Sequence, residues 1–226
     1  MVRPSGGFVT LEFVTIPPPS ISLEEGPDGR ELRMPGDRPG QGVRAVLEGV
    51  SIVGHPLVKL LRGCPGPVVD ATAGLGGDTA VLAALERRVL AIECSEILVQ
   101  LLEDARARVQ QPELQERIHL VHGDSVQVLR ALPEEFRKPA AILLDPMYPP
   151  RRRRSALPPK GMQALRLLHA GQPEGPPDEL LKAAFEAAPQ RVLLKRPPEA
   201  SSQEGQQAPT FSVGTKLVRW DAWELG

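Results

Sequence analysis

Asp145, Pro146 and Tyr148 stand together in a short segment whose residue types suit chemistry on an amino group attached to a flat ring. Such an amine is a poor nucleophile, because its lone pair is delocalised into the ring. The Asp145 carboxylate and a backbone carbonyl can accept its two hydrogens and aim the lone pair at an electrophile, and Asp145 can also take the proton. Pro146 stiffens the turn, and Tyr148 can stack on the ring. The alternative is a strand-ending turn with a buried aromatic.

Three glycines, Gly74, Gly76 and Gly77, lie between a short apolar run that ends at Asp70 and a helical segment that begins near Asp78, a candidate helix cap. The loop fits only part of the dinucleotide pattern G-x-G-x-x-G, because a threonine stands at the third glycine position. A shorter Asp-x-x-x-Gly-x-Gly loop suits the amino-acid end of S-adenosylmethionine, which carries no phosphate. The alternative is a tight turn that binds nothing.

Acidic residues also follow the next two apolar runs. Glu93 comes about 20 residues past the glycines, where nucleoside-binding α/β folds place an acid that accepts hydrogen bonds from ribose hydroxyls. Asp124 can accept from an adenine amino group, and the Ser125 hydroxyl can assist. Cys94 is interpreted as a packing residue or as a neighbour of the cofactor through its backbone. An acid after a strand and a Gly-Asp-Ser turn are also common without any ligand.

Basic residues follow the candidate catalytic segment directly. Arg151, Arg152, Arg153 and Arg154 precede Lys160, and Lys195 and Arg196 follow the last apolar run of the series. Because they lie near the segment that is expected to contact the ring, we expect them to contact nucleic-acid phosphates. The alternatives are a solvated charge run and, for Lys195, a residue that merely ends a strand.

Apolar runs alternate with segments of helical spacing through most of the chain. This alternation predicts an α/β fold with a doubly wound, mostly parallel sheet covered on both faces. Ligands bind such sheets at the carboxyl ends of the strands, where the residues named above stand. The expected strands are 68–71, 88–93, 118–121, 140–144 and 191–195, with a strand pair within 213–223, and the expected helices are 78–86, 95–109 and 178–188.

The first 60 residues are expected to form a small N-terminal region, and residues 61–226 the main domain. Within the N-terminal region, 8–14 and 31–34 have strand patterns and the stretch between them is typical of a loop. Residues 43–62 show helical spacing that is interrupted at a glycine and a proline.

Composition limits the function classes. The formal net charge is −1, so any affinity for nucleic acid must come from a local patch. The two cysteines form no C-x-x-C pair and the four histidines show no metal-ligand spacing, so neither a metal site nor a disulfide framework is expected. No secretory signal or apolar run of about 20 residues is present. A cytoplasmic monomer without membrane contact is therefore expected.

Taken together, these segments resemble the small-subunit ribosomal RNA methyltransferase J family over roughly residues 68–200, with a fainter similarity at 215–223. The segments D-A-T-A-G-L-G at 70–76, L-D-P-M-Y-P at 144–149 and K-R-P at 195–197 carry the resemblance. It implies a Rossmann-like class I methyltransferase fold, S-adenosyl-L-methionine as donor, and N2 of a guanine in 16S ribosomal RNA, free or in the small subunit, as acceptor. By position it implies cofactor contacts at Gly77, Asp78, Glu93, Cys94, Asp124, Ser125 and Asp145.

The chain departs from the family pattern at several positions. Gly77 stands where the family usually has a basic residue, and Glu93-Cys94 where it has Glu-Arg. The segment S-A-L-P-P-K-G-M at 155–162 replaces S-A-L-V-K-K-E-M, and 40–60 contains no counterpart of the family's Gly-rich basic segment. The chain is therefore interpreted as a divergent member.

Three alternatives to guanine methylation stay open at this point. The acceptor can be another amino group, such as adenine N6 in RNA or DNA or a protein glutamine. The chain can be a non-catalytic RNA-binding module that kept the fold, although pure binding does not need the Asp145–Tyr148 constellation. A nicotinamide oxidoreductase is disfavoured by the incomplete glycine pattern.

Overall fold

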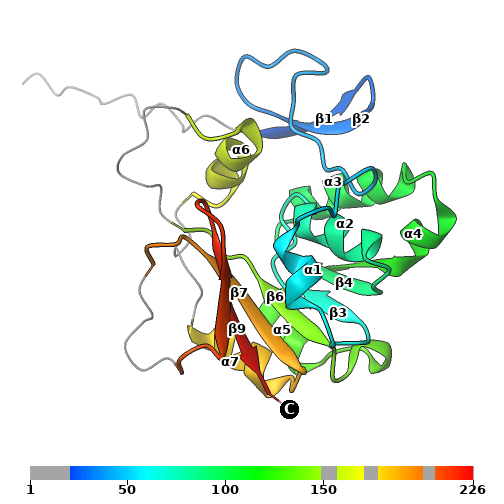
Figure 1. The fold of residues 1–226 in the computed structure, drawn as a ribbon. Helices are drawn as coiled ribbons and strands as arrows, with labels where there is room; N and C mark the ends of the chain where they lie inside the picture. The colour runs from blue at the N-terminus through cyan, green and yellow to red at the C-terminus, as the bar shows by residue number, and fades with distance from the viewer. Residues whose placement is uncertain (1–20, 149–156, 171–177, 201–206, 226) are drawn as a thin grey trace, which may run out of the picture.

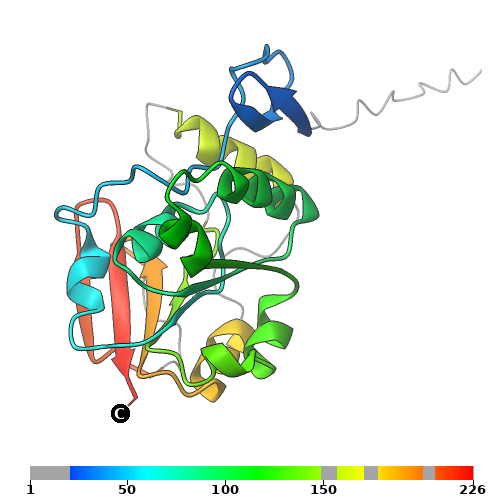
Figure 2. The same cartoon turned by 90° about the vertical axis from the view of Figure 1, so that its right-hand side faces the viewer.

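The computed structural model describes residues 21–148, 157–170, 178–200 and 207–225. The expected strand at 8–14 and the arginines at 151–154 lie outside these residues. The described chain forms one seven-stranded sheet with helices on both faces, and a two-stranded hairpin stands apart from that sheet (Figures 1 and 2).

The main sheet is mostly parallel, as expected. Its spatial order is β5-β4-β3-β6-β7-β9-β8, with β9 antiparallel to β7 and β8 antiparallel to β9. The chain order reverses between β3 and β6, and such a switch point is where doubly wound sheets bind ligands. The strands are β3 (Val68–Asp70), β4 (Val89–Glu93), β5 (Ile118–His122), β6 (Ala141–Leu144), β7 (Arg191–Arg196), β8 (Phe211–Gly214) and β9 (Arg219–Glu224).

The central strands are apolar on both faces. Val68 packs into the core on one face of the sheet and its neighbour Val69 into the core on the other, and both are fully buried. Leu143 and Ile142 of β6 divide between the same two cores. A strand that is covered on both sides needs a continuous apolar run, and this pattern is what made these strands predictable.

Helices complete the two layers around the sheet (Figures 1 and 2). Buried residues of α1, α2, α3 and α4 belong to one core, and those of α5 and α7 to the other. The helices are α1 (Pro56–Leu60), α2 (Gly77–Ala84), α3 (Glu96–Ala107), α4 (Pro112–Arg117), α5 (Ser125–Arg130), a 3-10 turn at Glu134–Phe136, α6 (Lys160–Leu168) and α7 (Asp178–Glu186).

The hairpin of β1 (Ser22–Gly26) and β2 (Gly29–Arg33) lies over α3 and near α6 (Figures 1 and 2). The backbone N–H of Arg30 donates to Asp104 Oδ2 of α3 at 3.1 Å. Glu31 is fully buried, and its carboxylate accepts hydrogen bonds from the backbone N–H groups of Gly40 and Gly42. The hairpin is thus tied to α3 through Asp104 and to the segment that follows the hairpin through Glu31.

The structure corrects the expectation for 43–62. Only α1 is helical there, and the residues before it run as an extended segment. Gly49 and Gly54 have φ of 75° and 72°, a left-handed conformation that does not continue a helix. The stretch expected to be a loop before residue 31 contains β1, and the short helices α4, α5 and α6 were not foreseen. No helix of the described ranges is both long and apolar enough to cross a membrane.

Candidate active site

The carboxyl ends of four parallel strands bring the predicted site residues to one edge of the sheet. Asp70 ends β3, Glu93 ends β4, Asp145 follows β6, and Lys195 lies near the end of β7. Because these strands are neighbours in the order β4-β3-β6-β7, residues far apart in the chain meet at the switch point. Asp78, in the first turn of α2, adds a fourth carboxyl group to those of Asp70, Glu93 and Asp145.

The glycine loop is held by carboxylates at both of its ends. Glu93 is buried, and its Oε2 accepts from the Gly74 N–H at 2.8 Å while its Oε1 accepts from the Ser95 N–H at 2.8 Å. Asp70 accepts from the Thr79 hydroxyl at 2.6 Å. The acid predicted to contact ribose is therefore also a structural partner of the loop.

Gly76 is required where the loop turns into α2. Its φ is 79°, and a Cβ there would lie 2.7 Å from side-chain atoms of both Leu47 and Leu102. Gly76 is also the N-cap of α2, which has no side-chain cap. Asp78, predicted as the cap, lies instead in the first turn of that helix. At Gly77, by contrast, a Cβ would meet no atom within 4 Å, so the loop faces open space at that point.

Asp145 is fixed from two sides. Its backbone N–H donates to the Thr72 hydroxyl at 2.6 Å, and its Oδ2 lies 2.9 Å from Lys195 Nζ. The same Nζ lies 2.8 Å from Asp78 Oδ2. Lys195 thus bridges the acid of the catalytic segment and the acid of α2, which are 67 positions apart in the chain (145 − 78).

Burial shifts the protonation of these acids. It raises the pKa of Asp70 to about 7, and the charges of Asp78 and Asp145 act in the same direction. The pKa of Asp145 is also raised, because the surrounding protein removes hydration, while Lys195 opposes this shift and the 41% of the side chain that stays exposed limits it. Burial lowers the pKa of Lys195, but the two acids outweigh it and leave that pKa raised.

Tyr148 points its hydroxyl into the protein. The hydroxyl oxygen is buried close to Arg196, and burial raises the pKa of the phenol to about 12. The phenol is therefore neutral at physiological pH. With the hydroxyl end held inside, the ring is the part of the side chain left to contact a planar ligand.

Three cations that were predicted to bind RNA make contacts within the chain. Arg196 is only 4% exposed and pairs with the buried Asp221 at 3.2 Å. Lys160 pairs with Asp37 at 2.6 Å and also donates to the Gln41 carbonyl, and Lys195 is held as described above. The burial of Arg196 argues against its contact with a phosphate. Arg151–Arg154 lie outside the described residues.

The residues after β5 tie the site to the second helical layer. Asp124 caps α5 by accepting from the Gln127 N–H at 2.9 Å, and the Ser125 hydroxyl donates to the Ala71 carbonyl at 2.6 Å. Cys94 is exposed, and its carbonyl lies 3.2 Å from a ring nitrogen of His122. These contacts place all three predicted residues at the same edge of the sheet as Glu93.

One residue, His55, and one helix, α6, lie near the site and were not predicted from the sequence. His55 caps α1 by accepting from the Leu57 N–H at 3.3 Å, and it lies within electrostatic reach of Asp78 and Lys195. Burial lowers the pKa of its imidazole. Helix α6 covers the glycine loop, since Leu165 lies 3.9 Å from the Cβ position of Gly74. Neither has a local motif that could have revealed it.

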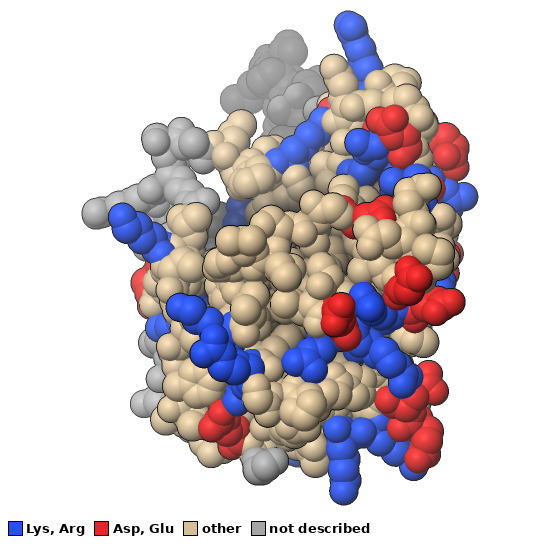
Figure 3. Space-filling view, turned by 45° about the vertical axis from the view of Figure 1, so that its right-hand side comes forward, with Lys and Arg blue, Asp and Glu red and all other residues tan. Residues whose placement is uncertain are grey.

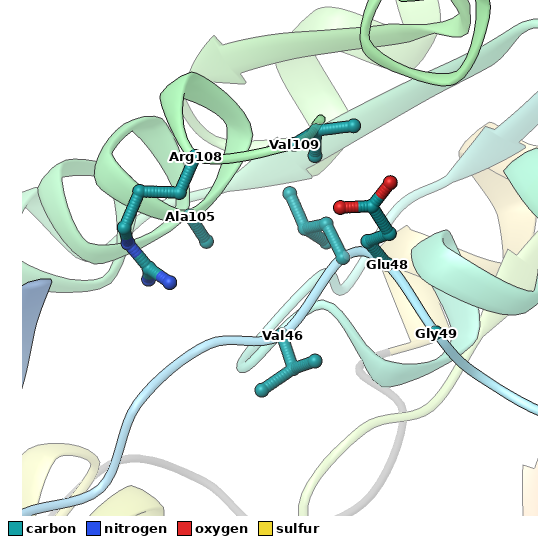
Figure 4. Close-up of a pocket in the computed structure, with 7 residues that line it drawn as sticks. Val46, Glu48, Gly49, Ala105, Arg108 and Val109 are labelled. Carbon is teal, nitrogen blue, oxygen red and sulfur yellow. The ribbon is translucent and has the colours of Figure 1, made fainter. Parts of the chain in front are cut away.

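A pocket away from this edge is lined by the segment 46–49 and the end of α3 (Figure 4). The charged side chains of this pocket already have partners in the chain. Glu48 accepts hydrogen bonds from the backbone N–H groups of Gln110 and Gln111, and Arg108 forms an ion pair with Asp104 at 2.8 Å. It contains none of the predicted site residues.

Comparisons with known proteins identify the family. A family described as "Putative SAM-dependent methyltransferase" matches residues 55–224. The ribosomal RNA small subunit methyltransferase J of Alkalilimnicola ehrlichii is 40% identical over 91% of this chain and 74% of that protein. The protein of the same name from Shewanella amazonensis is 40% identical over 74% of this chain and 66% of its own length. The chain belongs to the ribosomal RNA small subunit methyltransferase J family.

Structural similarity supports the same assignment. The crystal structure of the SAM-dependent methyltransferase NGO1261 from Neisseria gonorrhoeae is similar with a TM-score of 0.69 and 28% identity, over 94% of this chain and 86% of that one. As a member of the methyltransferase J family, the chain is an S-adenosylmethionine-dependent methyltransferase with the Rossmann-like class I fold. The expected fold, enzyme class and cofactor are thereby confirmed.

The site chemistry fits this cofactor. S-adenosylmethionine is a cation, and the edge carries the carboxyl groups of Asp70, Asp78, Glu93 and Asp145 against the ammonium group of Lys195. Even with Asp70 about half protonated near pH 7, the carboxyl groups outnumber the single ammonium group. The open space at Gly77 leaves room for a ligand beside the start of α2.

Proposed function

We propose that the enzyme methylates the exocyclic N2 of a guanine in 16S ribosomal RNA, either free or within the small ribosomal subunit. The observation that carries this proposal is the placement of Asp145 at the switch point, with Oδ2 held by Lys195 and its backbone held by Thr72. The names of the relatives, which specify small-subunit ribosomal RNA, support the choice of acceptor.

The proposed donor site is the glycine loop and the strand ends around it. Glu93 would receive the ribose hydroxyls, and Asp124 and Ser125 the adenine. The start of α2 and the Asp70 region would receive the amino-acid end. The full proposed set is Asp70, Gly74, Gly76, Gly77, Asp78, Glu93, Cys94, Asp124, Ser125 and Asp145.

The proposed mechanism is mainly positioning. When bound, S-adenosylmethionine supplies an electrophilic methyl group. Asp145 accepts a hydrogen bond from the guanine amine, holds its lone pair toward that methyl group, and takes the proton that the amine loses. Pro146 stiffens the turn. Tyr148, whose hydroxyl is buried, offers its ring for stacking on the base.

RNA binding must depend on a local basic patch. Figure 3 shows Lys and Arg side chains interspersed with Asp and Glu around an uncharged centre, so that face carries no field of a single sign. We propose that Arg151–Arg154, which follow the catalytic segment directly in the sequence, make the phosphate contacts. We further propose residues 61–226 as the methyltransferase domain and 1–60 as a small N-terminal region, in a cytoplasmic monomer that needs no metal.

Methyl transfer from labelled S-adenosylmethionine to purified small subunits that lack this modification tests the proposal. We expect label in guanine N2 with the wild-type protein and, with Asp145→Asn, a rate lowered by about 10²–10⁴-fold at unchanged fold. Label in adenine, in DNA or in a glutamine of a release factor would replace guanine as the acceptor. Cofactor and RNA binding without transfer to any acceptor would indicate an RNA-binding module instead.

A further inference from the structure

Lys195 makes three contacts that fix its ammonium group. Nζ lies 2.8 Å from Asp78 Oδ2 and 2.9 Å from Asp145 Oδ2, and it lies 5.3 Å from the centre of the Trp220 ring. Trp220 is 1% exposed and is the register partner of Lys195 in the antiparallel pair of β7 and β9. A buried ring beneath the ammonium group adds a cation–π attraction and leaves Nζ little freedom to reach a phosphate.

We propose that Lys195 is a positioning residue of the methyl transfer. It orients the Asp145 carboxylate and keeps it ionised, and through Asp78 it links the segment that contains Asp145 to helix α2. This inference rests on the proposed role of Asp145 as acceptor of the amine hydrogens. It replaces the role in RNA binding that the sequence suggested for Lys195.

The first part of the argument concerns orientation. Because Lys195 holds Oδ2, Asp145 presents Oδ1 to the acceptor amine. The backbone of the same residue is held by Thr72 of the glycine loop. Asp145 is thus held at its backbone by Thr72 and at one carboxylate oxygen by Lys195. A misplacement of about 1 Å between reacting groups can cost about 10²-fold in rate.

The second part concerns charge. The ionisable groups that face Lys195 and Asp145 are Asp70 at the end of β3, Asp78 on α2, His55 at the start of α1, and the Tyr148 phenol, which stays neutral at physiological pH. The two aspartates repel the Asp145 carboxylate and favour its protonated form, and His55, whose pKa is lowered by burial, adds little positive charge near neutral pH. Lys195 opposes them at contact distance.

The proton balance explains why the ionised form matters. The N2 lone pair forms the new bond to carbon while the carbon–sulfur bond breaks and its electron pair stays on sulfur. The proton that N2 loses passes to Asp145 Oδ1 and then to water. A carboxyl group that is already protonated cannot accept it, so loss of Lys195 should restrict transfer to higher pH.

The test compares Lys195→Met, Lys195→Arg and wild type, with Lys182→Met as a matched control, since Lys182 is exposed on α7 and its acidic contact is Glu186 at 3.9 Å. Single-turnover methyl transfer to small subunits is followed against pH at saturating cofactor. For Lys195→Met we expect a rate lowered by up to about 10²-fold at neutral pH, with the acidic limb of the profile displaced upward by about 1 unit or more.

Lys195→Arg separates charge from position. It keeps the positive charge, so the acidic limb should stay near that of wild type, whereas the different geometry of the guanidinium should still lower the rate. Lys182→Met should match wild type in both respects. Calorimetric titration with S-adenosylhomocysteine confirms that each variant is folded and binds the cofactor product.

The pKa of Asp145 is measured directly by carbon-13 NMR of the aspartate carboxyls, with Asp145→Asn providing the assignment. An increase in Lys195→Met supports the inference, and an unchanged pKa together with an unchanged acidic limb overturns it. The NMR measurement of the Asp145 pKa does not require a methyl acceptor. If the wild-type protein methylates no small subunit, the proposed function fails, while the NMR result still decides whether Lys195 controls the carboxylate.

Discussion

At the scale of single residues, Asp70 combines deep burial with two neighbouring acids. The residue is 3% exposed, and burial raises its pKa to about 7. In the unfolded chain the carboxyl group ionises near pH 3.8. The native state therefore binds a proton more tightly than the unfolded state, and this contribution to stability is fully present below pH 3.8 and is lost as pH rises through 7.

Asp70→Asn provides the corresponding prediction. We expect the difference in unfolding free energy between wild type and Asp70→Asn to fall as pH rises from 4 to 7.5, by up to about 1.4 kcal/mol per unit. Urea unfolding at constant ionic strength measures it. A difference that stays constant over this range would mean that Asp70 is ionised in the native protein.

Glu93 combines a structural and a proposed binding role. In Glu93→Gln one carboxylate oxygen becomes an NH2 group that faces a backbone donor, at either Gly74 or Ser95. We expect a loss of about 1–3 kcal/mol in stability, together with weaker binding of S-adenosylhomocysteine.

Thermal unfolding and calorimetric titration measure the two effects. The control is Glu96→Gln, because Glu96 is exposed and its hydrogen bond is to Gln100. Unchanged affinity in Glu93→Gln would count against recognition of the ribose.

At the scale of elements, the turn from β3 into α2 depends on Gly76. Gly76→Ala places a Cβ against Leu47 and Leu102 at a φ of 79°. We expect a destabilisation of at least about 1–2 kcal/mol, the cost of the left-handed conformation alone.

Gly77→Ala is the matched control, because its Cβ meets no atom within 4 Å and alanine favours helix over glycine by about 0.5–1 kcal/mol. Thermal unfolding without cofactor compares the two. Equal unfolding temperatures would show that Leu47 and Leu102 move aside at no cost.

At the scale of the whole molecule, charge is nearly balanced, with 27 basic and 28 acidic residues. RNA affinity therefore depends on where the cations lie. We expect replacement of Arg151–Arg154 by serine to weaken RNA binding and to lower the slope of log affinity against log salt by roughly 0.7–0.9 per lost phosphate contact.

A control with the same change in net charge replaces arginines that pair with acids elsewhere on the surface, namely Arg30, Arg44, Arg130 and Arg137. Filter binding of a ribosomal RNA fragment over a salt series compares the two variants. Equal slopes for the two variants would indicate that Arg151–Arg154 do not contact RNA phosphates.

Local sequence patterns predicted much of the fold and the residues of the candidate donor site. Continuous apolar runs such as 140–144 predicted the central strands, because a strand covered on both faces has to be apolar throughout. Acids and glycines that directly follow such runs, such as Asp70 and Asp145, could be placed at one edge, since parallel strands end together. The six-residue helix α5 and the hairpin strand β1 were missed or mistaken for loop, because so short a segment carries little periodicity.

The tertiary structure alone decided what the cations do. Lys195 and Asp78 are 117 positions apart, and Lys160 and Asp37 are 123 apart, so no spacing in the sequence could pair them. The sheet order brings β7 next to β6 and within reach of α2, and it thereby turns Lys195 from a candidate phosphate contact into the partner of two acids. Composition and motif determine which charges exist, whereas strand order and burial determine which of them meet.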